Sequence, residues 1–423
     1  MFGNNFTHPR NFIFLNKVNL IIGNSAAAIS AVKAIRRCDT HSRIILVAAE
    51  NCNAYSPVLL TYYMSNIIGK SKLFITDENF YNYYSVEARF GEKAINVNPV
   101  IKEVALESGE KMVYDNLLIA TGSSPKAINL PGEDLPGIFS VKKIADAEKI
   151  VECNVKAKEV AVLGGGLIGL QVANALHKTG RKVTMVVSSD QLLSQNVDSK
   201  CAEMIEREIV FNNISVLYRK QVCGFQEIGR GLRINMNLNE MIEADMIVLG
   251  KGTEPNKDLV NNSGIKYSTG IIVDEYMRTN YPDVYAAGDV AEGPNIVYEK
   301  NSIVPNWINA CNQGFTAGSN MAGKSSSYYA LNENITSVFS RKIAILGNVD
   351  QNRGADIVDN VYCAEDTGIY RKIRWNSAGE IVGAVLFEKV DDAGIIRNLI
   401  KNRTAITKSV REQLPRKKAF PLA

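Results

Sequence analysis

One glycine-rich stretch constrains this chain more than any other. Residues 160–170 read V-A-V-L-G-G-G-L-I-G-L, so a buried strand pattern runs through glycines directly into an apolar helical pattern. This G-x-G-x-x-G spacing between a strand and a helix is typical of a turn that binds a dinucleotide pyrophosphate. Its glycines allow a tight turn and close backbone approach to the anion, which the helix N-terminus faces. The residues predicted for this site are Gly164, Gly166, Leu167, Ile168 and Gly169.

A second, less regular copy of the pattern lies near the N-terminus. The apolar run 18–22 is followed by G-N-S-A-A-A, in which Ser25 replaces the second glycine and Ala28 the third. Small side chains still permit close approach of the backbone to a pyrophosphate. The residues predicted for this second dinucleotide site are Gly23, Asn24, Ser25, Ala26 and Ala28.

An acidic residue follows the next predicted strand, residues 43–47. Glu50 can accept hydrogen bonds from both ribose hydroxyls of an adenosine, and its spacing from the glycine turn favours that role over a solvated loop acid. The segment 55–63 then begins a predicted helix with Pro57 near its first turn. Its tyrosines are explained equally well as core residues and as cofactor contacts.

Two further strand ends are similar to each other. The strand predicted within residues 114–125 ends in A-T-G-S-S-P, and the one within 244–256 ends in G-K-G-T-E-P-N. This similarity predicts two related nucleotide-binding halves. A later strand ends in Gly288-Asp289, where a carboxylate can face the ribityl chain or the pyrophosphate of a flavin.

Composition excludes several classes of protein. The length of 423 residues predicts two or three domains, and a net charge of +4 gives no sign of nucleic-acid binding. The seven cysteines include no C-x-x-C and no zinc pattern, which predicts reduced thiols, a cytoplasmic location and no metal site. The apolar run 12–15 is too short for a signal peptide, and no stretch reaches the length of a membrane span.

The sequence texture changes after residue 323. Apolar and polar residues alternate over 338–400, which predicts an antiparallel sheet that closes with a helix from Asp391. The basic residues of 408–418 are predicted to form a solvated tail.

Taken in order, these motifs resemble the FAD-dependent pyridine nucleotide–disulfide oxidoreductase superfamily. The Y-S-P-V-L-L-T-Y-Y, W-I-N-A-C-N-Q-G and G-A-V-L-F-E segments look most like NADH:rubredoxin reductases and the flavin domain of the nitrite reductase large subunit. The resemblance implies an α/β fold with two Rossmann-like dinucleotide-binding domains of the three-layer ββα type and a small C-terminal α+β domain. The further cofactor-binding residues that it implies are Asn51, Pro57, Ala94, Ala120, Thr121, Gly122, Gly252, Gly288 and Asp289, together with Glu50.

The resemblance also implies how the chain is divided. We expect an FAD-binding domain made of residues 1–137 and 255–325, and an inserted NAD(P)-binding domain of residues 138–254. Residues 326–410 are expected to form the C-terminal α+β domain, and 411–423 a basic tail.

The chain departs from the superfamily pattern at three places. Disulfide reductases carry cysteines on the helix after the ribose acid, but residues 56–60 contain none, so dithiol chemistry is not expected. Gln171 stands where many relatives carry Glu. Val187 ends the strand at which an NADH enzyme places an acid to bind the ribose 2′-hydroxyl. Asp190 could take that role, the site could accept both NADH and NADPH, or the ligand could be another adenine nucleotide.

The leading hypothesis is an FAD-dependent NAD(P)H oxidoreductase that passes electrons to a small redox protein such as a rubredoxin, a ferredoxin or another iron–sulfur protein. No side chain is singled out as a catalytic proton donor, because the cofactors carry the chemistry. One alternative is an FAD-carrying electron-transfer subunit of a larger complex whose middle domain binds ADP or ATP structurally. Another is a nucleotide sensor without turnover, which the FAD motifs argue against. The oligomeric state, homodimer or subunit of a redox complex, stays open.

Overall fold

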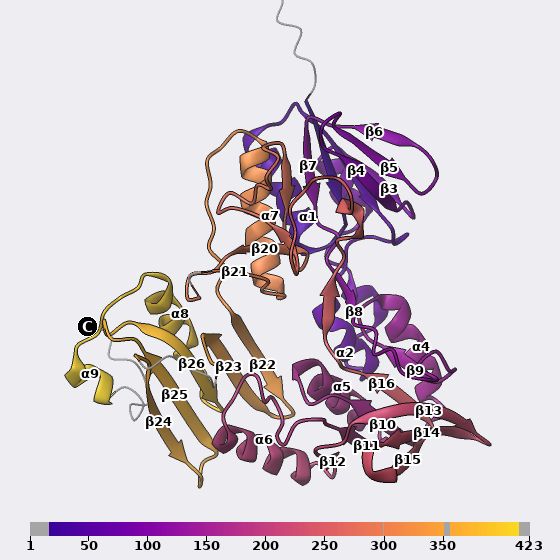
Figure 1. Cartoon of the computed structure of the whole chain (residues 1–423), viewed down its shortest axis with the longest axis vertical. Helices are drawn as coiled ribbons and strands as arrows, with labels where there is room; N and C mark the ends of the chain where they lie inside the picture. The colour runs from indigo at the N-terminus through magenta and orange to yellow at the C-terminus, as the bar shows by residue number, and fades with distance from the viewer. Residues whose placement is uncertain (1–16, 299, 351–355, 414–423) are drawn as a thin grey trace, which may run out of the picture.

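The structure is a computed structural model that describes residues 17–298, 300–350 and 356–413. Figure 1 shows three bodies, two built on parallel sheets and a third, at the C-terminal end of the chain, built on an antiparallel sheet. The expected α/β fold with two Rossmann-like units and a C-terminal α+β unit is confirmed. No helix within the described residues has both the length and the apolar character needed to cross a membrane.

The first body contains a five-stranded parallel sheet whose central strands are buried and mostly apolar. In spatial order the strands are β19 (Val284–Ala286), β7 (Asn116–Ile119), β1 (Val18–Ile22), β2 (Arg43–Ala48) and β3 (Val86–Phe90). An antiparallel three-stranded sheet accompanies it, formed by β4 (Ala94–Asn98), β5 (Glu103–Leu106) and β6 (Lys111–Val113). Residues 99–102 form the turn between β4 and β5.

Two helices from distant parts of the chain lie side by side in this body. They are α1 (Ala26–Cys38) and α7 (Trp307–Met321). A Cβ atom on Gly314 would lie 2.0 Å from the Ala27 carbonyl oxygen, and one on Gly318 would lie 2.4 Å from the Ala31 carbonyl oxygen. Small residues on both helices therefore allow the backbones to approach closely. This contact joins the N-terminal segment to the segment that follows the second body.

The second body contains another five-stranded parallel sheet, with the order β12 (Ser215–Leu217), β11 (Lys182–Val186), β10 (Glu159–Leu163), β16 (Met246–Leu249) and β9 (Ile138–Ser140). Its helices are α4 (Ile144–Asn154), α5 (Leu167–Lys178) and α6 (Ser199–Phe211). Its antiparallel strands are β13 (Val222–Ile228), β14 (Gly231–Met236) and β15 (Met241–Ala244). The short antiparallel pair β8 (Ser123–Pro125) and β17 (Thr253–Pro255) lies on the two chain segments that join this body to the first.

The third body is the predicted antiparallel sheet. Its strands are β22 (Glu333–Val338), β23 (Arg341–Gly347), β26 (Ile381–Phe387), β25 (Ile369–Trp375) and β24 (Val358–Ala364), and α8 (Ala393–Lys401) packs against it. Residues 408–413, expected as the start of a solvated tail, form helix α9 (Lys408–Gln413) instead. The Arg411 guanidinium lies 5.9 Å from the centre of the Trp375 ring, so the expectation of a solvated tail is wrong for Arg411, whereas Lys408 and Ser409 are exposed as expected. Residues 414–418 of that prediction lie outside the described residues.

The remaining elements are short. They are η1 (Pro57–Leu59), α2 (Leu60–Met64), η2 (Lys70–Leu73), α3 (Glu78–Tyr83), η3 (Asn237–Asn239), η4 (Asp258–Val260), β18 (Ile271–Ile272), β20 (Ala291–Pro294) and β21 (Asn301–Ser302). Leu60 and Met64 of α2 are buried in the same apolar cluster as residues of α4, α5 and the C-terminal sheet. This shared core fixes α2 against the second body, although α2 belongs in sequence to the first.

Candidate dinucleotide-binding sites

The turn after β1 has the backbone geometry expected of a pyrophosphate site. Gly23 has a φ of +120°, and a Cβ atom there would lie 2.1 Å from the Ala120 carbonyl oxygen. Only glycine therefore fits between β1 and β7. Ser25 is the N-cap of α1 but its side chain makes no capping hydrogen bond, which leaves backbone N–H groups of the first helical turn for an anion. Ala26 and Ala28 are buried in that turn.

The turn after β10 repeats this geometry. Gly164 has a φ of +123°, and a Cβ atom there would lie 2.4 Å from the Gly250 carbonyl oxygen. A Cβ atom on Gly169 would lie 2.1 Å from the Gly164 carbonyl oxygen, whereas one on Gly166 would meet no atom within 4 Å. Gly166 thus faces open space at the start of α5, where Leu167 and Ile168 form its first turn. Both glycine turns lead into a helix N-terminus, and the open space at Gly166 is one into which a phosphate can fit.

The predicted ribose acid has a partner that the sequence does not reveal. The Tyr55 hydroxyl donates a hydrogen bond to Glu50 Oε2 over 2.9 Å. Burial of the Tyr55 ring and the nearby Glu50 carboxylate both raise the pKa of Tyr55, so this hydroxyl stays protonated and acts as a donor. Tyr55 therefore orients Glu50 from a buried position, and its contact with a cofactor stays a prediction.

The second predicted acid, Asp289, is also held by partners. Asp289 Oδ2 accepts a hydrogen bond from Ser123 Oγ over 2.7 Å and forms an ion pair with Lys142 Nζ at 3.0 Å. Lys142 follows β9 and so brings a cation from the second body to the acid of the first. Nothing in the spacing of Lys142 could have shown this contact, because it depends on how the two bodies pack.

The two similar strand ends contact each other. Thr121 Oγ1 donates to the Asn256 carbonyl oxygen over 2.7 Å, and Asn256 Nδ2 donates to the Thr121 carbonyl oxygen over 2.9 Å. The Asn256 N–H donates to the Gly122 carbonyl oxygen, and that of Lys126 donates to the Gly252 carbonyl oxygen. The A-T-G and G-K-G-T-E-P-N segments therefore form one joint between the bodies, in which Ala120, Thr121, Gly122 and Gly252 lie.

The start of α7 leaves polar atoms without partners. Within the described residues, Asn306 Nδ2 and Asn309 Oδ1 are buried and make no hydrogen bond. Gln313 of the same helix accepts a hydrogen bond from the Gly288 N–H over 2.8 Å, which ties α7 to the Gly288–Asp289 strand end. A glycine turn, two oriented acids and unused amide groups on one body are the donors and acceptors that FAD requires, so the residues present fit this group.

Three of the predicted cofactor-contacting residues lie outside the two glycine turns. Asn51 is exposed, and a Cβ atom on the neighbouring Gly91 would lie 3.6 Å from it. Pro57 begins η1, and Ala94 begins β4 opposite Leu106. Their contact with a cofactor stays a prediction.

Val187 is buried beneath the second glycine turn. Its side chain is 1% exposed, and a Cβ atom on Gly165 would lie 2.8 Å from Val187 Cγ1. Asp190 is exposed on the loop that follows. Gln171 Nε2 donates to Thr336 Oγ1 over 2.8 Å, so this residue connects α5 to β22. Val187 therefore offers no carboxylate at the position where the sequence pattern predicts a ribose acid.

Cys52 lies on the loop between Glu50 and Tyr55. Burial and the nearby Glu50 carboxylate raise the pKa of its thiol. A thiol with a raised pKa is a poor nucleophile, and residues 56–60 supply no second cysteine. This environment disfavours dithiol chemistry at the segment where disulfide reductases place it.

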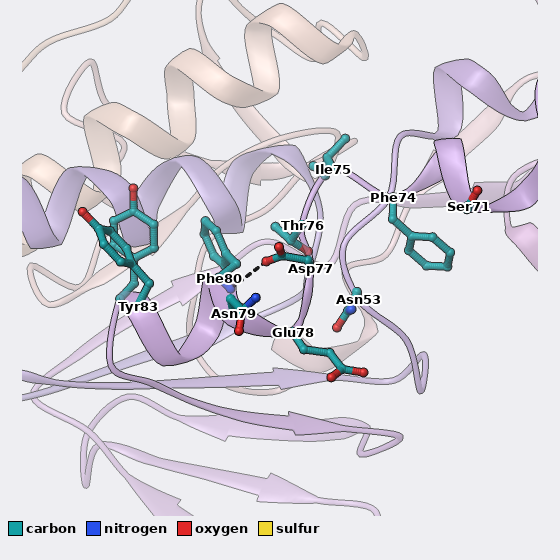
Figure 2. Close-up of a pocket in the computed structure, with 11 residues that line it drawn as sticks. Asn53, Ser71, Phe74, Ile75, Thr76, Asp77, Glu78, Asn79, Phe80 and Tyr83 are labelled. Atoms are coloured by element: carbon teal, nitrogen blue, oxygen red, sulfur yellow. Dashed lines mark hydrogen bonds between the residues drawn. The ribbon is translucent and has the colours of Figure 1, made fainter.

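An open groove of about 860 Å³ lies beside the first turn and does not include either glycine turn. Figure 2 shows Asp77 and Glu78 between the rings of Phe74 and Phe80. Tyr81 of the adjoining helix α3 donates from its hydroxyl to Asn24 Oδ1 over 2.9 Å. The groove is therefore lined by Phe80, the sequence neighbour of Tyr81, and Tyr81 is the residue that contacts the first glycine turn.

Comparison with known proteins gives concordant results. A family described as pyridine nucleotide-disulphide oxidoreductase matches residues 18–314. The NADH-dependent phenylglyoxylate dehydrogenase subunit epsilon of Aromatoleum evansii is 30% identical over 92% of this chain and 92% of its own length. The NADH-rubredoxin oxidoreductase of Clostridium acetobutylicum is 29% identical over 86% of this chain and 91% of its own length. A ferredoxin reductase structure from Rhodopseudomonas palustris superposes with a TM-score of 0.87 at 20% identity, over 95% of this chain and 99% of that one.

Proposed function

Because the chain belongs to the pyridine nucleotide-disulphide oxidoreductase family, we propose that it transfers electrons from NADH or NADPH to a small iron–sulfur protein. Family membership makes it an FAD-dependent oxidoreductase that uses NAD(P)H. The observation that carries the proposal is the pair of glycine turns with the same geometry, on two bodies joined through β8 and β17. Two dinucleotides held in this way can react with each other.

The two turns take different roles in this proposal. Residues 1–137 and 255–325 form the FAD-binding domain, residues 138–254 the NAD(P)-binding domain and 326–410 the C-terminal domain. The assignment rests on Glu50, Asp289 and the unused amides of α7, which belong to the first body. The second body offers its glycine turn but no acid at the end of β11.

The residues of the chain bind and orient the cofactors. Glu50 accepts the adenosine ribose hydroxyls of FAD, while the turns at Gly23 and Gly164 hold one pyrophosphate each. Asp289 faces the ribityl chain or the pyrophosphate of FAD, and Ser123 and Lys142 fix its direction. FAD, when bound, supplies an acceptor for hydride that can return electrons singly. Residues 56–60, where disulfide reductases carry their cysteines, contain none, so the electrons leave to an external acceptor.

Anaerobic stopped-flow mixing tests the first half of the proposal. We expect the flavin absorbance of the holoprotein to bleach on mixing with NADH, NADPH or both. Subsequent mixing with a purified rubredoxin or ferredoxin tests the second half, and the iron–sulfur absorbance is expected to fall. The proposal is wrong if neither nucleotide bleaches the flavin.

The basic C-terminal residues support an acidic partner. Complementary charge raises the rate at which redox proteins meet, and Arg416, Lys417 and Lys418 add three cations after α9. Deletion of residues 414–423 leaves the contact of Arg411 with Trp375 in place. We expect this truncation to slow electron transfer to an acidic acceptor and to reduce its dependence on salt. An unchanged rate and an unchanged salt dependence would contradict a role of these basic residues in attracting the acceptor.

A second candidate is an electron-transfer subunit whose middle domain holds ADP or ATP structurally. The buried Val187 favours it, because no acid is placed to select a nicotinamide dinucleotide. One relative is itself named as a subunit of an NADH-dependent dehydrogenase. Nucleotides extracted from the purified protein discriminate: stoichiometric ADP or ATP together with FAD supports this candidate. The cytoplasmic location stays a prediction in either case.

A further inference from the structure

Lys251 lies where the second parallel sheet meets the first body. It follows β16 and stands between Gly250 and Gly252. The Gly250 N–H donates to the Leu163 carbonyl oxygen over 2.7 Å, and the Gly250 carbonyl oxygen occupies the position that a Cβ atom on Gly164 would need. Lys251 therefore starts one residue from the backbone that shapes the glycine turn.

A second lysine leaves the same edge of the sheet. β9 and β16 are parallel, with Leu249 opposite Ser140. Lys251 and Lys142 each lie two residues beyond this pair, at the carboxyl ends of neighbouring strands. Lys142 is neutralised by the chain itself, since its ammonium contacts Asp289 at 3.0 Å and Ser123 Oγ at 2.7 Å.

Lys251 has no such partner. Within the described residues no hydrogen bond or ion pair reaches its ammonium, although the side chain is partly buried. Burial alone lowers the pKa of Lys251, and no acidic side chain opposes this effect. An unpaired, partly buried cation lowers the stability of the folded protein unless an anion from outside the chain binds to it and forms an ion pair.

We propose that the Lys251 ammonium binds the nicotinamide-side phosphate of the dinucleotide held at the Gly164 turn. This inference rests on the proposed function, and it adds a side-chain ligand to a site otherwise built from backbone N–H groups. The turn places the pyrophosphate at the start of α5, and the chain from Gly250 through Lys251 to β17 runs from that turn toward the first body. Lys251 thus lies on the stretch of backbone that leads from the turn to the first body, the direction in which the nicotinamide must extend to reach the flavin.

Binding of nucleotide fragments to the FAD-loaded protein tests this role. Calorimetry compares ADP-ribose, which has both phosphates, with AMP, which has only the adenosine-side phosphate. We expect Lys251→Gln to weaken ADP-ribose about tenfold and to leave AMP within about twofold, because one charge-assisted contact is lost. Lys251→Arg is expected to stay within about threefold of the wild type, because it keeps the charge.

A matched control comes from Lys126, whose backbone N–H contacts Gly252 while its side chain is exposed. Lys126→Gln removes the same charge nearby and is expected to change neither affinity. The proposal is overturned if Lys251→Gln leaves ADP-ribose binding unchanged, if AMP weakens equally, or if Lys251→Arg loses as much as Lys251→Gln. A shift in the flavin midpoint potential with unchanged ADP-ribose binding would assign Lys251 to the flavin and overturn it too.

The same experiment separates this inference from the proposed function. If the wild-type protein binds ADP-ribose and is reduced by NADH or NADPH, a silent Lys251→Gln variant contradicts the inference alone. If the wild-type protein binds no ADP-ribose and is not reduced, both are wrong.

Discussion

The Tyr55 hydroxyl and the Glu50 carboxylate form a hydrogen bond of 2.9 Å across one turn of the loop after β2. An acid that is oriented before its ligand arrives loses less conformational entropy on binding. The bond therefore orients the acid that is predicted to hold the adenosine ribose at the first site.

Glu50 and Tyr55 predict graded losses of FAD. We expect Glu50→Ala to weaken FAD at least about tenfold, because hydrogen bonds to a charged acceptor are lost. Tyr55→Phe should weaken FAD by a smaller factor, about threefold, because the acid remains but is less well oriented. The measurement is flavin release during dilution, followed by fluorescence. Glu107→Ala, at an exposed acid of the same body, serves as the control and should retain FAD.

Substitution of Gly164 and of Gly166 in the second glycine turn is expected to affect different properties, the first stability and the second nucleotide binding. Gly164→Ala should destabilise the second body by about 2 kcal/mol or more, because φ is positive and the new Cβ would meet the Gly250 carbonyl oxygen at 2.4 Å. Gly166→Ala should leave stability nearly unchanged, since nothing lies within 4 Å of its Cβ, but should weaken NAD(P)H binding. Thermal unfolding and nucleotide titration of both variants check this. Equal losses of stability would contradict the assignment of Gly166 to an open ligand site.

The edge of the second sheet predicts the nucleotide preference. The Arg219 N–H donates to the Ser189 carbonyl oxygen over 3.0 Å, so the backbone that follows β12 lies beside the loop after Val187. Lys220 is paired with Glu240, whereas the Arg219 side chain is exposed. We expect NADPH to bind at least as well as NADH, and Arg219→Ala to weaken NADPH about fivefold while sparing NADH. Steady-state KM values for both nucleotides measure this, and an equal rise in both would exclude a contact with the 2′-phosphate.

The contacts of Asp198 between the second and third bodies predict how the stability of the protein depends on pH. Its carboxylate caps α6 through the Cys201 N–H, accepts a hydrogen bond from the Tyr370 hydroxyl and contacts Lys372 Nζ at 3.0 Å. Burial alone would raise the pKa of Asp198, but the hydrogen bonds from Tyr370 and Cys201 and the charge of Lys372 outweigh burial and lower it below 3.8.

A lowered carboxyl pKa stabilises the folded state at pH values above 3.8, and this contribution is lost as the pH falls through the lowered pKa. Asp198→Asn should therefore cost about 1–2 kcal/mol near pH 6, and the difference from the wild type should shrink below pH 4. Urea unfolding at both pH values, with circular dichroism as the readout, measures it. A difference that does not depend on pH would show that the charge of Asp198 is not what stabilises this contact.

The sequence by itself determined what depends on local backbone geometry. The turns at Gly23 and Gly164 were predictable because a tight strand-to-helix turn over a neighbouring strand requires small residues at fixed spacings. The antiparallel sheet of the third body was also predictable, although β23 and β26 are buried along most of their length because successive side chains point into two different apolar clusters.

Only the tertiary structure decided the contacts between segments that are far apart in the chain. The similarity between residues 120–122 and 250–256 predicted two related halves, but it did not show that these segments bind each other through Thr121 and Asn256. Lys142 reaches Asp289, and Arg411 reaches Trp375, because packing of whole bodies brings them together over long sequence separations. Sequence spacing records which residues share an element, whereas the position of one element against another is set by the burial of apolar surface between them.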